Sequence, residues 1–359
     1  MRVVLAGGGT AGHIEPALAL ADALRRLDAS IGVTCVGTER GLETRLVPAR
    51  GYDLELVPAV PLPRTLTPQL LTVPGRLAGA VNAVAAVLDR VQADILVGFG
   101  GYVATPAYLA AKRRGLPIVV HEANPRPGLA NRLGAKLTDH VFTGFPDGGA
   151  LPRAEYIGTP LRREIVELDR LSMGDKARSW FGLQTHRPTL LVFGGSQGAR
   201  SINEAALAAA PALRAAGVQV LHVVGAKNTV DHEPPPGDPQ YVLLPYVTRM
   251  DLAYAAADLV LCRSGALTCA ELTAVGLPAA YVPLPHGNGE QRINAERVTA
   301  AGGGVLVDDA ELSAGWITDH LLPLLHDPER VAAMSEAASA LGTKDADTIL
   351  ARKVLEIAR

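Results

Sequence analysis

The most constraining feature of the sequence is a pattern that occurs twice: a short apolar run, a glycine-rich turn and an alanine- and leucine-rich amphipathic run. The first copy, RVVLAGGGTAGHIEPALALADAL, is at residues 2–24, and the second, TLLVFGGSQGARSINEAALAAAPAL, is at residues 189–213. Unbroken apolar runs that alternate with helical segments are typical of parallel sheets covered by helices on both faces. The repeat therefore predicts an α/β chain with two Rossmann-like parallel-sheet domains.

The other apolar runs extend this pattern along the whole chain. The predicted strands are residues 2–7, 31–37, 94–100, 117–122 and 140–144, followed by 189–195, 218–225, 241–245, 258–262, 279–283 and 303–308. A glycine- and proline-rich segment interrupts the alternation near Thr159, and a new helix at 174–183 precedes the second sheet. We therefore expect domains at residues 1–159 and 160–343, with a terminal helix at 344–359 that could pack back on the first domain.

Composition narrows the class of protein. The chain has 359 residues, 48% of them hydrophobic and 19% charged, which predicts packed globular domains rather than disorder. A net charge of −2 argues against an extended nucleic-acid surface. The three cysteines have neither metal-ligand nor disulfide spacing, which favours a reducing compartment. No apolar stretch approaches the roughly 20 residues of a membrane-spanning helix, and the first apolar run is too short for a signal peptide.

The first glycine turn contains Gly7-x-Gly9-x-x-Gly12, the spacing of a dinucleotide-binding loop. Such a turn brings a phosphate close to the backbone at a helix N-terminus, and Glu39 is placed to bind an NAD ribose. A glycine-rich turn can equally be structural in any α/β protein. His13 follows the turn, and the helix dipole there favours a neutral imidazole that can accept a proton. The alternative is a capping or packing histidine.

Polar residues cluster at the end of another predicted strand. His121, Glu122 and Asn124 follow the apolar run PIVV, at the edge where open α/β sheets bind their ligands. Glu122 either contacts a substrate or caps a helix that starts near Gly128, and capping is also an alternative for Asn124.

The second half contains two further anion-type turns. Ser196, in FGGSQGARSIN, is placed to bind a phosphate, to cap the next helix, or to do both. Ser264, Gly265 and Ala266 open another helix, with Glu271 about two turns into it, where it either bonds ribose hydroxyls or faces solvent. The loop that follows is dense in hydrogen-bonding groups, which suits either sugar recognition or simple solvation. These groups are His286, Asn288, Glu290, Gln291 and Asn294.

Taken in order, these motifs resemble the bacterial MurG-type transferases of glycosyltransferase family 28 over nearly the whole chain. The matching stretches are GGGTAGHIEPALALADAL, HEANPRPGLANR, GGSQGARSIN, RSGALTCAELTAVGLPAAYVPLP and GEQRINA. The resemblance implies a GT-B fold, with two Rossmann-like domains facing each other across a cleft. It also implies an inverting transfer of N-acetylglucosamine (GlcNAc) from UDP-GlcNAc to the 4-hydroxyl of the N-acetylmuramic acid (MurNAc) in lipid I. The product is lipid II, a precursor for peptidoglycan synthesis.

The resemblance also assigns roles to individual residues. It implies His13 as catalytic base, with Glu122 as the alternative, and an acceptor-phosphate loop at Gly8, Gly9, Thr10 and Gly12. No metal-ligand set is apparent and no cofactor is implied, since UDP-GlcNAc is a substrate; a requirement for a divalent ion is left open. Ala11 and Glu290 depart from the family pattern. The implied donor-binding residues are Thr10, Ala11, Gly12, Asn124, Arg162, Ser196, Ser264, Gly265, Ala266, Leu267, Thr268, Glu271, Gln291 and Asn294.

A lipid-linked acceptor implies contact with the cytoplasmic face of the cell membrane. Residues 61–90 are apolar and carry Arg64, Arg76 and Arg90, which fits a peripheral contact, although residues after Leu77 are expected to face the core. Undecaprenyl-linked lipid I and the membrane surface are thus the implied partners, with other cell-wall synthesis proteins as candidates and no nucleic acid. The competing functions are another GT-B transferase, a UDP-GlcNAc epimerase, an NAD-dependent oxidoreductase and a non-catalytic nucleotide-sugar sensor.

Overall fold

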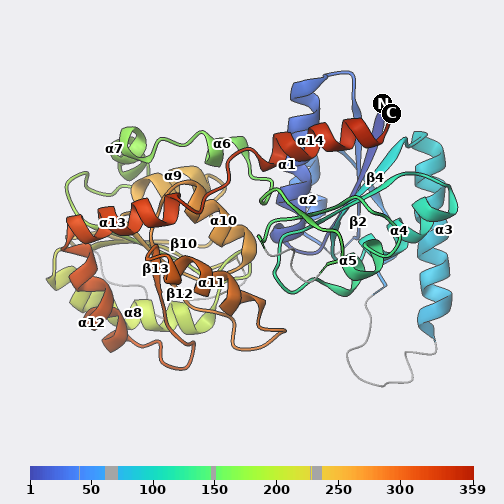
Figure 1. The fold of residues 1–359 in the computed structure, drawn as a ribbon. Coiled ribbons are helices and arrows are strands. Elements are labelled where there is room, and N and C mark those ends of the chain that lie inside the picture. The colour runs from blue at the N-terminus through green and yellow to red at the C-terminus, as the bar shows by residue number, and fades with distance from the viewer. Residues whose placement is uncertain (40, 61–71, 147–150, 227, 229–236) are drawn as a thin grey trace. The chain divides into compact units, whose positions relative to one another are not determined.

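The computed structural model describes residues 1–39, 41–60, 72–146, 151–226, 228 and 237–359. They fall into two compact units (Figure 1). Unit 1 comprises Met1–Arg162 and Lys344–Arg359, and unit 2 comprises Arg163–Thr343. Each unit is built on one parallel sheet, so the predicted fold class, two Rossmann-like parallel-sheet domains, is confirmed.

Unit 1 contains a seven-stranded sheet in the order β3-β2-β1-β4-β5-β6-β7, in which every pairing is parallel. Strand β1 pairs with β2 on one side and β4 on the other, so the strand order reverses there. In open α/β sheets, ligands bind outside the carboxyl ends of the strands at such a reversal. The strands are β1 (Arg2–Gly7), β2 (Gly32–Gly37), β3 (Asp53–Leu56), β4 (Ile95–Gly100), β5 (Ile118–Glu122), β6 (Val141–Thr143) and β7 (Glu155–Tyr156).

Helices cover both faces of this sheet because alternate residues of each strand point to opposite faces. Val3 and Leu5 of β1 belong to a core cluster with α1 and α14, whereas Val4 and Ala6 belong to a cluster with α3 and α4. The C-terminal helix α14 therefore contributes to the core of unit 1. The helices are α1 (Ala11–Leu27), α2 (Glu43–Ala49), α3 (Val73–Val91), α4 (Ala104–Arg113), α5 (Leu129–Gly134) and α14 (Ala346–Ile357).

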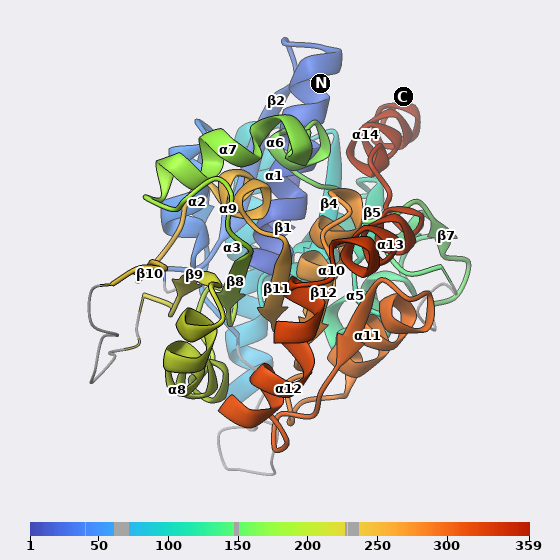
Figure 2. The same cartoon turned by 90° about the vertical axis from the view of Figure 1, so that its left-hand side faces the viewer.

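Unit 2 contains a six-stranded parallel sheet in the order β10-β9-β8-β11-β12-β13, and all six strands match the predicted runs. Its strands are β8 (Thr189–Phe193), β9 (Gln219–Val223), β10 (Tyr241–Leu244), β11 (Leu259–Cys262), β12 (Ala279–Tyr281) and β13 (Gly304–Leu306). Helices α8 (Arg200–Ala215) and α12 (Ala314–Leu325) cover one face, and α7 (Arg170–Trp180) and α9 (Met250–Ala256) cover the other (Figure 2). The remaining helices are α6 (Arg163–Val166), α10 (Ala266–Ala274), α11 (Glu290–Ala300) and α13 (Pro328–Ser339).

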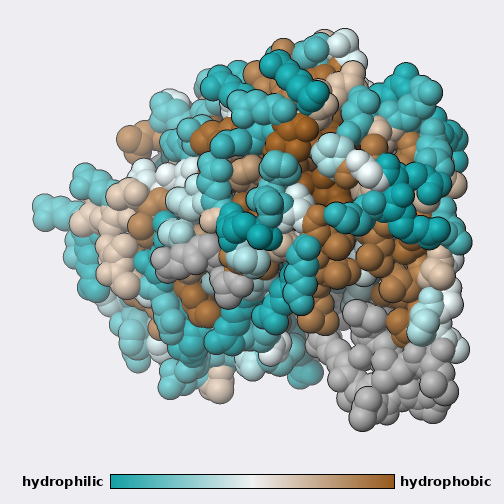
Figure 3. All heavy atoms as spheres, turned by 45° about the vertical axis from the view of Figure 1, so that its right-hand side comes forward, coloured by the Kyte–Doolittle hydropathy of each residue, from teal (hydrophilic) through white to brown (hydrophobic). Residues whose placement is uncertain are grey.

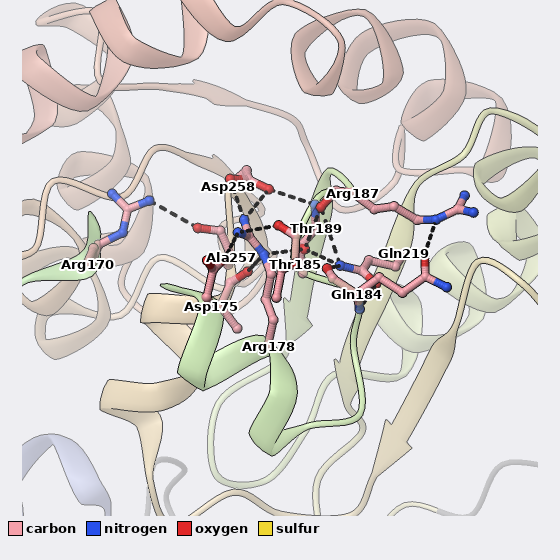
Figure 4. Close-up of polar contacts among 11 residues, drawn as sticks. Arg170, Asp175, Arg178, Gln184, Thr185, Arg187, Thr189, Gln219, Ala257 and Asp258 are labelled. Carbon is pink, nitrogen blue, oxygen red and sulfur yellow. Dashed lines mark hydrogen bonds and ion pairs between the residues drawn. The ribbon is translucent and has the colours of Figure 1, made fainter. Parts of the chain in front are cut away.

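A polar network ties the amino-terminal ends of three strands of unit 2 together (Figure 4). Arg178 of α7 donates to both carboxylate oxygens of Asp258, at 2.9 and 3.0 Å, and Asp258 accepts from the backbone N–H of Thr189 at 2.8 Å. Gln219 donates to the Thr189 hydroxyl at 2.9 Å. Because this network occupies the ends where β8, β9 and β11 begin, the opposite, carboxyl edge is the one left for ligands.

Three details differ from the sequence predictions. Strands β3 and β7 were not predicted, because β3 is a short, half-exposed run of alternating acidic and apolar residues and β7 is an exposed pair at the sheet edge. Helix α7 begins at Arg170 rather than at residue 174, because the Asp169 side chain accepts from the Ser172 N–H at 3.2 Å and caps it.

The segment proposed for membrane contact is only partly described. Arg64 lies outside the described residues. Arg90 forms an ion pair with Glu55 at 2.6 Å, so its charge is paired within the protein. Ala80, Val84 and other residues of α3 beyond Leu77 are buried, as expected. Among the helices of the described residues, none is both long and apolar enough to cross a membrane.

Candidate active site

The first glycine turn of unit 1 is held in shape by a buried glutamate. Oε2 of Glu43 accepts the backbone N–H of Gly9 at 2.9 Å, and Oε1 accepts the N–H and the hydroxyl of Thr38 at 2.8 and 3.0 Å. Gly9 has a φ of +90°, a conformation that favours glycine. The Gly9 N–H therefore has a hydrogen-bond partner within the fold, the carboxylate of Glu43.

His13 lies in the first turn of α1, directly after this loop. Its Nδ1 lies 3.2 Å from the Gly8 carbonyl oxygen and 3.3 Å from the Thr10 hydroxyl. A carbonyl can only accept, and a hydroxyl can accept as well, so both contacts are satisfied when Nδ1 carries the proton. In the neutral ring, Nε2 then has the free lone pair that a general base requires.

The surroundings of His13 favour the neutral ring. Burial lowers the pKa of His13, and the negative charge of Glu122, the Gly8 hydrogen bond and the charge of Glu43 oppose that shift without cancelling it. A Cβ atom added at Gly100 would lie 3.2 Å from Nε2, so the glycine at the end of β4 leaves room beside this nitrogen. The lowered pKa therefore favours the neutral ring, the state in which a ring nitrogen carries the lone pair that a base needs.

Glu122, at the end of β5, is fully engaged inside the protein. Its Oε1 accepts from the backbone and side-chain nitrogens of Asn124 at 2.9 and 3.1 Å. Its Oε2 accepts from the Gly128 N–H at 3.1 Å and from Nδ2 of Asn131 at 3.0 Å. With four donors on a side chain that is 3% exposed, Glu122 is a structural organiser of the loop between β5 and α5. The N-cap of α5 is Gly128, so neither Glu122 nor Asn124 is the cap residue.

The other predicted residues of unit 1 lie around the same edge of the sheet. Thr10 is the N-cap residue of α1, and Ala11 and Gly12 form its first turn, where backbone N–H groups have no partner within the helix. Arg162 lies 3.7 Å from Oε2 of Glu15 in α1. His121 is different: it is 1% exposed, and Nε2 contacts the Gly158 carbonyl at 2.9 Å, so it belongs to the core.

In unit 2, Ser196 lies in the turn between β8 and α8. The N-cap of α8 is Ala199, so Ser196 does not cap this helix. Gly195 and Gly198 on either side have φ of +85° and +74°, which lets the backbone turn tightly. Ser196 therefore lies at the carboxyl end of β8, on the ligand-binding edge of the sheet.

The turn after β11 contains a buried hydroxyl without a partner. Ser264 is fully buried, and its Oγ forms no hydrogen bond within the described residues. Its carbonyl accepts from Nδ2 of Asn294 at 3.1 Å, which ties α11 to this turn. Gly265 is the N-cap of α10, and Ala266, Leu267 and Thr268 form the first turn. The hydroxyl and the helix N-terminus together are the kind of site that binds a phosphate.

Glu271 and Gln291 are held in defined positions. Glu271 is 5% exposed and accepts the Tyr254 hydroxyl at 2.8 Å, so the alternative of a solvent-facing glutamate is wrong. Oε1 of Gln291 accepts the Leu284 N–H at 3.0 Å, which fixes the side chain beside the loop after β12. Glu290 begins α11, where a negative charge is favourable to the helix dipole.

Sequence reasoning missed several residues of this site, above all Glu43, Thr38 and Asn131. The nearby Glu39, considered for an NAD ribose, is exposed instead. The sequence does contain a signal for Glu43, namely the glycines at positions 37 and 41. A Cβ atom at either glycine would collide with the Glu43 side chain, so both positions need glycine to make room for it. Within the described ranges, no group of three or more His, Cys, Asp or Glu side chains is placed to hold a metal ion.

Comparison with known proteins identifies the family. Residues 3–143 match the N-terminal domain of glycosyltransferase family 28, and residues 189–350 match its C-terminal domain. A Thermobifida fusca protein named UDP-N-acetylglucosamine–N-acetylmuramyl-(pentapeptide) pyrophosphoryl-undecaprenol N-acetylglucosamine transferase is 66% identical over 100% of this chain and 95% of its own length. The chain belongs to glycosyltransferase family 28. A second family member with the same name, from Streptomyces avermitilis, is 62% identical over 99% of this chain and 98% of its own.

A solved structure supports the same assignment. The crystal structure of MurG from Acinetobacter baumannii, at 25% identity, has a TM-score of 0.74 and covers 99% of each chain. The predicted GT-B fold of this family 28 glycosyltransferase is thereby confirmed. The family assignment also excludes the hypothesis of an NAD-dependent oxidoreductase, which rested on the spacing of the first glycine turn alone.

Proposed function

We propose that this chain transfers GlcNAc from UDP-GlcNAc to the 4-hydroxyl of the MurNAc of lipid I, with inversion at the anomeric carbon, to form lipid II. The full-length similarity to transferases named for this reaction supports the choice of substrates. The structural observation that carries the chemistry is His13, whose Nδ1 contacts the Gly8 carbonyl and whose Nε2 keeps its lone pair.

The reaction is a single in-line displacement. The 4-hydroxyl oxygen attacks C1 of the donor sugar, the bond from C1 to the diphosphate oxygen breaks, and UDP leaves with the electron pair. His13 Nε2 takes the hydroxyl proton, a step that a general base typically accelerates by about 10²–10⁴-fold. The leaving diphosphate is stabilised by helix N-termini, which supply backbone N–H groups and positive dipole ends.

Unit 1 is assigned to the acceptor. The first turn of α1, at Ala11 and Gly12, offers N–H groups to the acceptor diphosphate, while the Gly9 N–H donates to Glu43. Glu122 is assigned to positioning, since its four hydrogen bonds leave its oxygens engaged with the loop that carries Asn124. His13 is then the remaining candidate base of the two proposed from sequence.

Unit 2 is assigned to the donor. Ser196 and Ser264 lie at the carboxyl ends of neighbouring strands, where two helices begin, and suit the UDP diphosphate. Glu271 is placed to accept ribose hydroxyls, and Gln291 to contact the donor sugar, with Asn294 supporting the turn. Arg162, Thr10 and Asn124 of unit 1 remain proposed as further donor contacts.

The proposal is tested by following UDP release from UDP-GlcNAc with and without a soluble lipid I analogue, and by mass spectrometry of the product. Acceptor-dependent release with formation of the GlcNAc–MurNAc disaccharide supports it. Conversion of UDP-GlcNAc to an isomeric nucleotide sugar without acceptor would instead support the epimerase. Donor binding with neither reaction would point to another acceptor or to a nucleotide-sugar sensor.

We also propose that the chain works as a peripheral protein on the cytoplasmic face of the cell membrane, where a lipid-linked acceptor is reached. Tyr102 and Leu129, which follow β4 and β5, are 55% and 69% exposed. Figure 3 shows hydrophobic atoms gathered on this face of the molecule and bordered by hydrophilic ones. Arg76, at the start of α3, is exposed and donates to the Ala59 carbonyl at 3.2 Å.

Flotation with anionic vesicles tests this contact. The wild-type chain is expected to float with the vesicles, and an Arg64→Ala/Arg76→Ala variant to float less, because arginine side chains are attracted to anionic head groups. Equal flotation of both proteins would exclude a role for these two arginines.

A further inference from the structure

The two ends of one peptide group in the first glycine turn contact different ionisable side chains. The N–H of Gly9 donates to Oε2 of Glu43 at 2.9 Å, and the carbonyl oxygen of Gly8 lies 3.2 Å from Nδ1 of His13. This carbonyl and this N–H belong to the same planar peptide unit, in which they point in opposite directions. The carboxylate, the peptide and the imidazole therefore form one continuous hydrogen-bonded chain.

We propose that Glu43 is a positioning residue for the transfer reaction, acting on His13 through the Gly8–Gly9 peptide. The proposal rests on the proposed function, because it takes His13 as the base. Glu43 fixes the plane of this peptide, so that its carbonyl holds the proton on Nδ1 and leaves the lone pair on Nε2. Hydrogen bonds linked in a chain also polarise one another, which makes the Gly8 carbonyl a stronger acceptor and Nε2 more basic.

The burial of Glu43 supports a specific role. The side chain is fully buried and all three of its hydrogen-bond partners donate to it, the N–H and hydroxyl of Thr38 on one oxygen and the Gly9 N–H on the other. A Cβ added at Gly8 would lie 2.8 Å from Oε1, so the glycine permits the close approach of loop and carboxylate. A buried carboxylate is costly unless it is fully hydrogen-bonded, and this one uses a donor of the glycine loop itself.

The negative charge of Glu43 also makes His13 more basic. The negative charges of two carboxylates, Glu122 of β5 and Glu43 of α2, raise the pKa of His13 against the larger lowering by burial. Glu43 differs from Glu122 because it is also linked to Nδ1 through the peptide. Removal of the Glu43 carboxylate is therefore expected to lower the pKa of His13. It is also expected to increase the share of the tautomer that carries its proton on Nε2 instead of Nδ1.

The test compares Glu43→Gln with Thr38→Val. The glutamine cannot accept from both Thr38 and Gly9, and it removes the charge. Thr38→Val removes one hydrogen bond to Glu43, at 3.0 Å, but keeps both the carboxylate and its contact with Gly9. For Glu43→Gln we expect kcat to fall by roughly tenfold or more. We also expect the acid limb of the pH profile of kcat/KM to move by about 0.5 pH unit to lower pH, because the pKa of His13 is lowered. For Thr38→Val we expect an unchanged acid limb.

Nitrogen-15 NMR of the histidine rings gives a readout that does not depend on turnover. The His13 signals are identified by their absence from a His13→Gln spectrum. In the wild-type chain at pH 7 we expect the Nδ1–H tautomer, and in Glu43→Gln an increased share of Nε2–H. An Nε2–H tautomer in the wild type, or an unmoved tautomer and acid limb in Glu43→Gln, would overturn the proposal. If His13→Gln keeps full activity, the base assignment fails, while the tautomer still reports on the link to Glu43.

Discussion

Nδ2 of Asn131 donates to Oε2 of Glu122 across 3.0 Å, and both side chains are buried. This contact joins α5 to the end of β5 and completes the set of four donors around one carboxylate. The fold needs a carboxylate at position 122 because only a side chain with two accepting oxygens can take hydrogen bonds from all four donors.

The first prediction concerns Glu122→Gln. A glutamine amide can accept on one side only, so its NH₂ group must face either the two nitrogens of Asn124 or those of Gly128 and Asn131. We expect the free energy of unfolding to fall by roughly 1–3 kcal/mol, the cost of unsatisfied buried donors. Chemical denaturation measures this change. The control is Glu167→Gln, which removes an exposed ion pair to Arg163 and should cost about 0.5 kcal/mol or less.

The same variant distinguishes positioning from proton transfer. We expect Glu122→Gln to raise KM for UDP-GlcNAc more than it lowers kcat, because the loop that carries the proposed donor contact Asn124 is disturbed rather than the base. Full stability combined with a loss of kcat as large as that of a His13 variant would instead make Glu122 the base.

The second prediction concerns Ser264→Ala in the donor turn. Because the buried Oγ forms no hydrogen bond within the described residues, its removal should leave the stability of the chain nearly unchanged. If the hydroxyl donates to the UDP diphosphate, affinity for UDP should fall about tenfold, the effect of one hydrogen bond to a charged group. Calorimetric titration with UDP measures it. An unchanged Kd would remove Ser264 from the donor site.

The third prediction separates the contact of Glu271 with Tyr254 from its proposed contact with the ribose. Tyr254→Phe removes the internal hydrogen bond of 2.8 Å and should cost about 1 kcal/mol of stability while leaving UDP binding nearly intact. Glu271→Gln should weaken UDP by roughly five- to tenfold, because a neutral acceptor binds hydroxyls less strongly than a carboxylate. Binding of 2′,3′-dideoxy-UDP should be the same in Glu271→Gln and wild type. Equal losses for UDP and the dideoxy nucleotide would contradict a ribose contact.

The fourth prediction concerns pH and stability. Burial lowers the pKa of His121 and of His222 from 6.5 to about 4. The unfolded chain therefore binds protons at these side chains as the pH falls below about 6.5, while the folded chain does so only near pH 4. The free energy of unfolding is therefore highest above about pH 6.5 and falls on acidification. At pH 4 it is lower by roughly 3 kcal/mol for each of the two histidines.

Urea unfolding between pH 7 and pH 5 measures this loss. His222→Asn should unfold with a shallower dependence on pH, because it removes a buried histidine that binds its proton much more readily in the unfolded chain. The exposed His186 gives the matched control, His186→Asn, which should keep the wild-type dependence. An equal slope for His222→Asn and wild type would contradict the account of this side chain.

Much of the fold could be predicted from the sequence because unbroken apolar runs report buried parallel strands directly. All six strands of unit 2 follow this signal, whereas β3 and β7 of unit 1 do not, since short exposed strands owe their pairing to neighbours rather than to their own composition. The position of α14 on the core of unit 1 depends on packing between segments distant in sequence, which periodicity does not encode.

The site was predictable to the extent that its residues follow a strand or begin a helix. His13, Ser196 and Ser264 all do so. Glu43 does not, because its function depends on a three-dimensional contact with a loop 34 residues away in sequence. Likewise, the number of donors around Glu122 was not visible in the sequence, and that number favours positioning over catalysis.

The most direct test of the account is the single-turnover rate of GlcNAc transfer by His13→Gln, with UDP-GlcNAc and the lipid I analogue both saturating. Removal of the base should lower this rate by roughly 10²–10⁴-fold, while the Kd for UDP stays at its wild-type value because the donor residues of unit 2 are intact. A rate within about threefold of wild type would show that His13 takes no proton in the transfer.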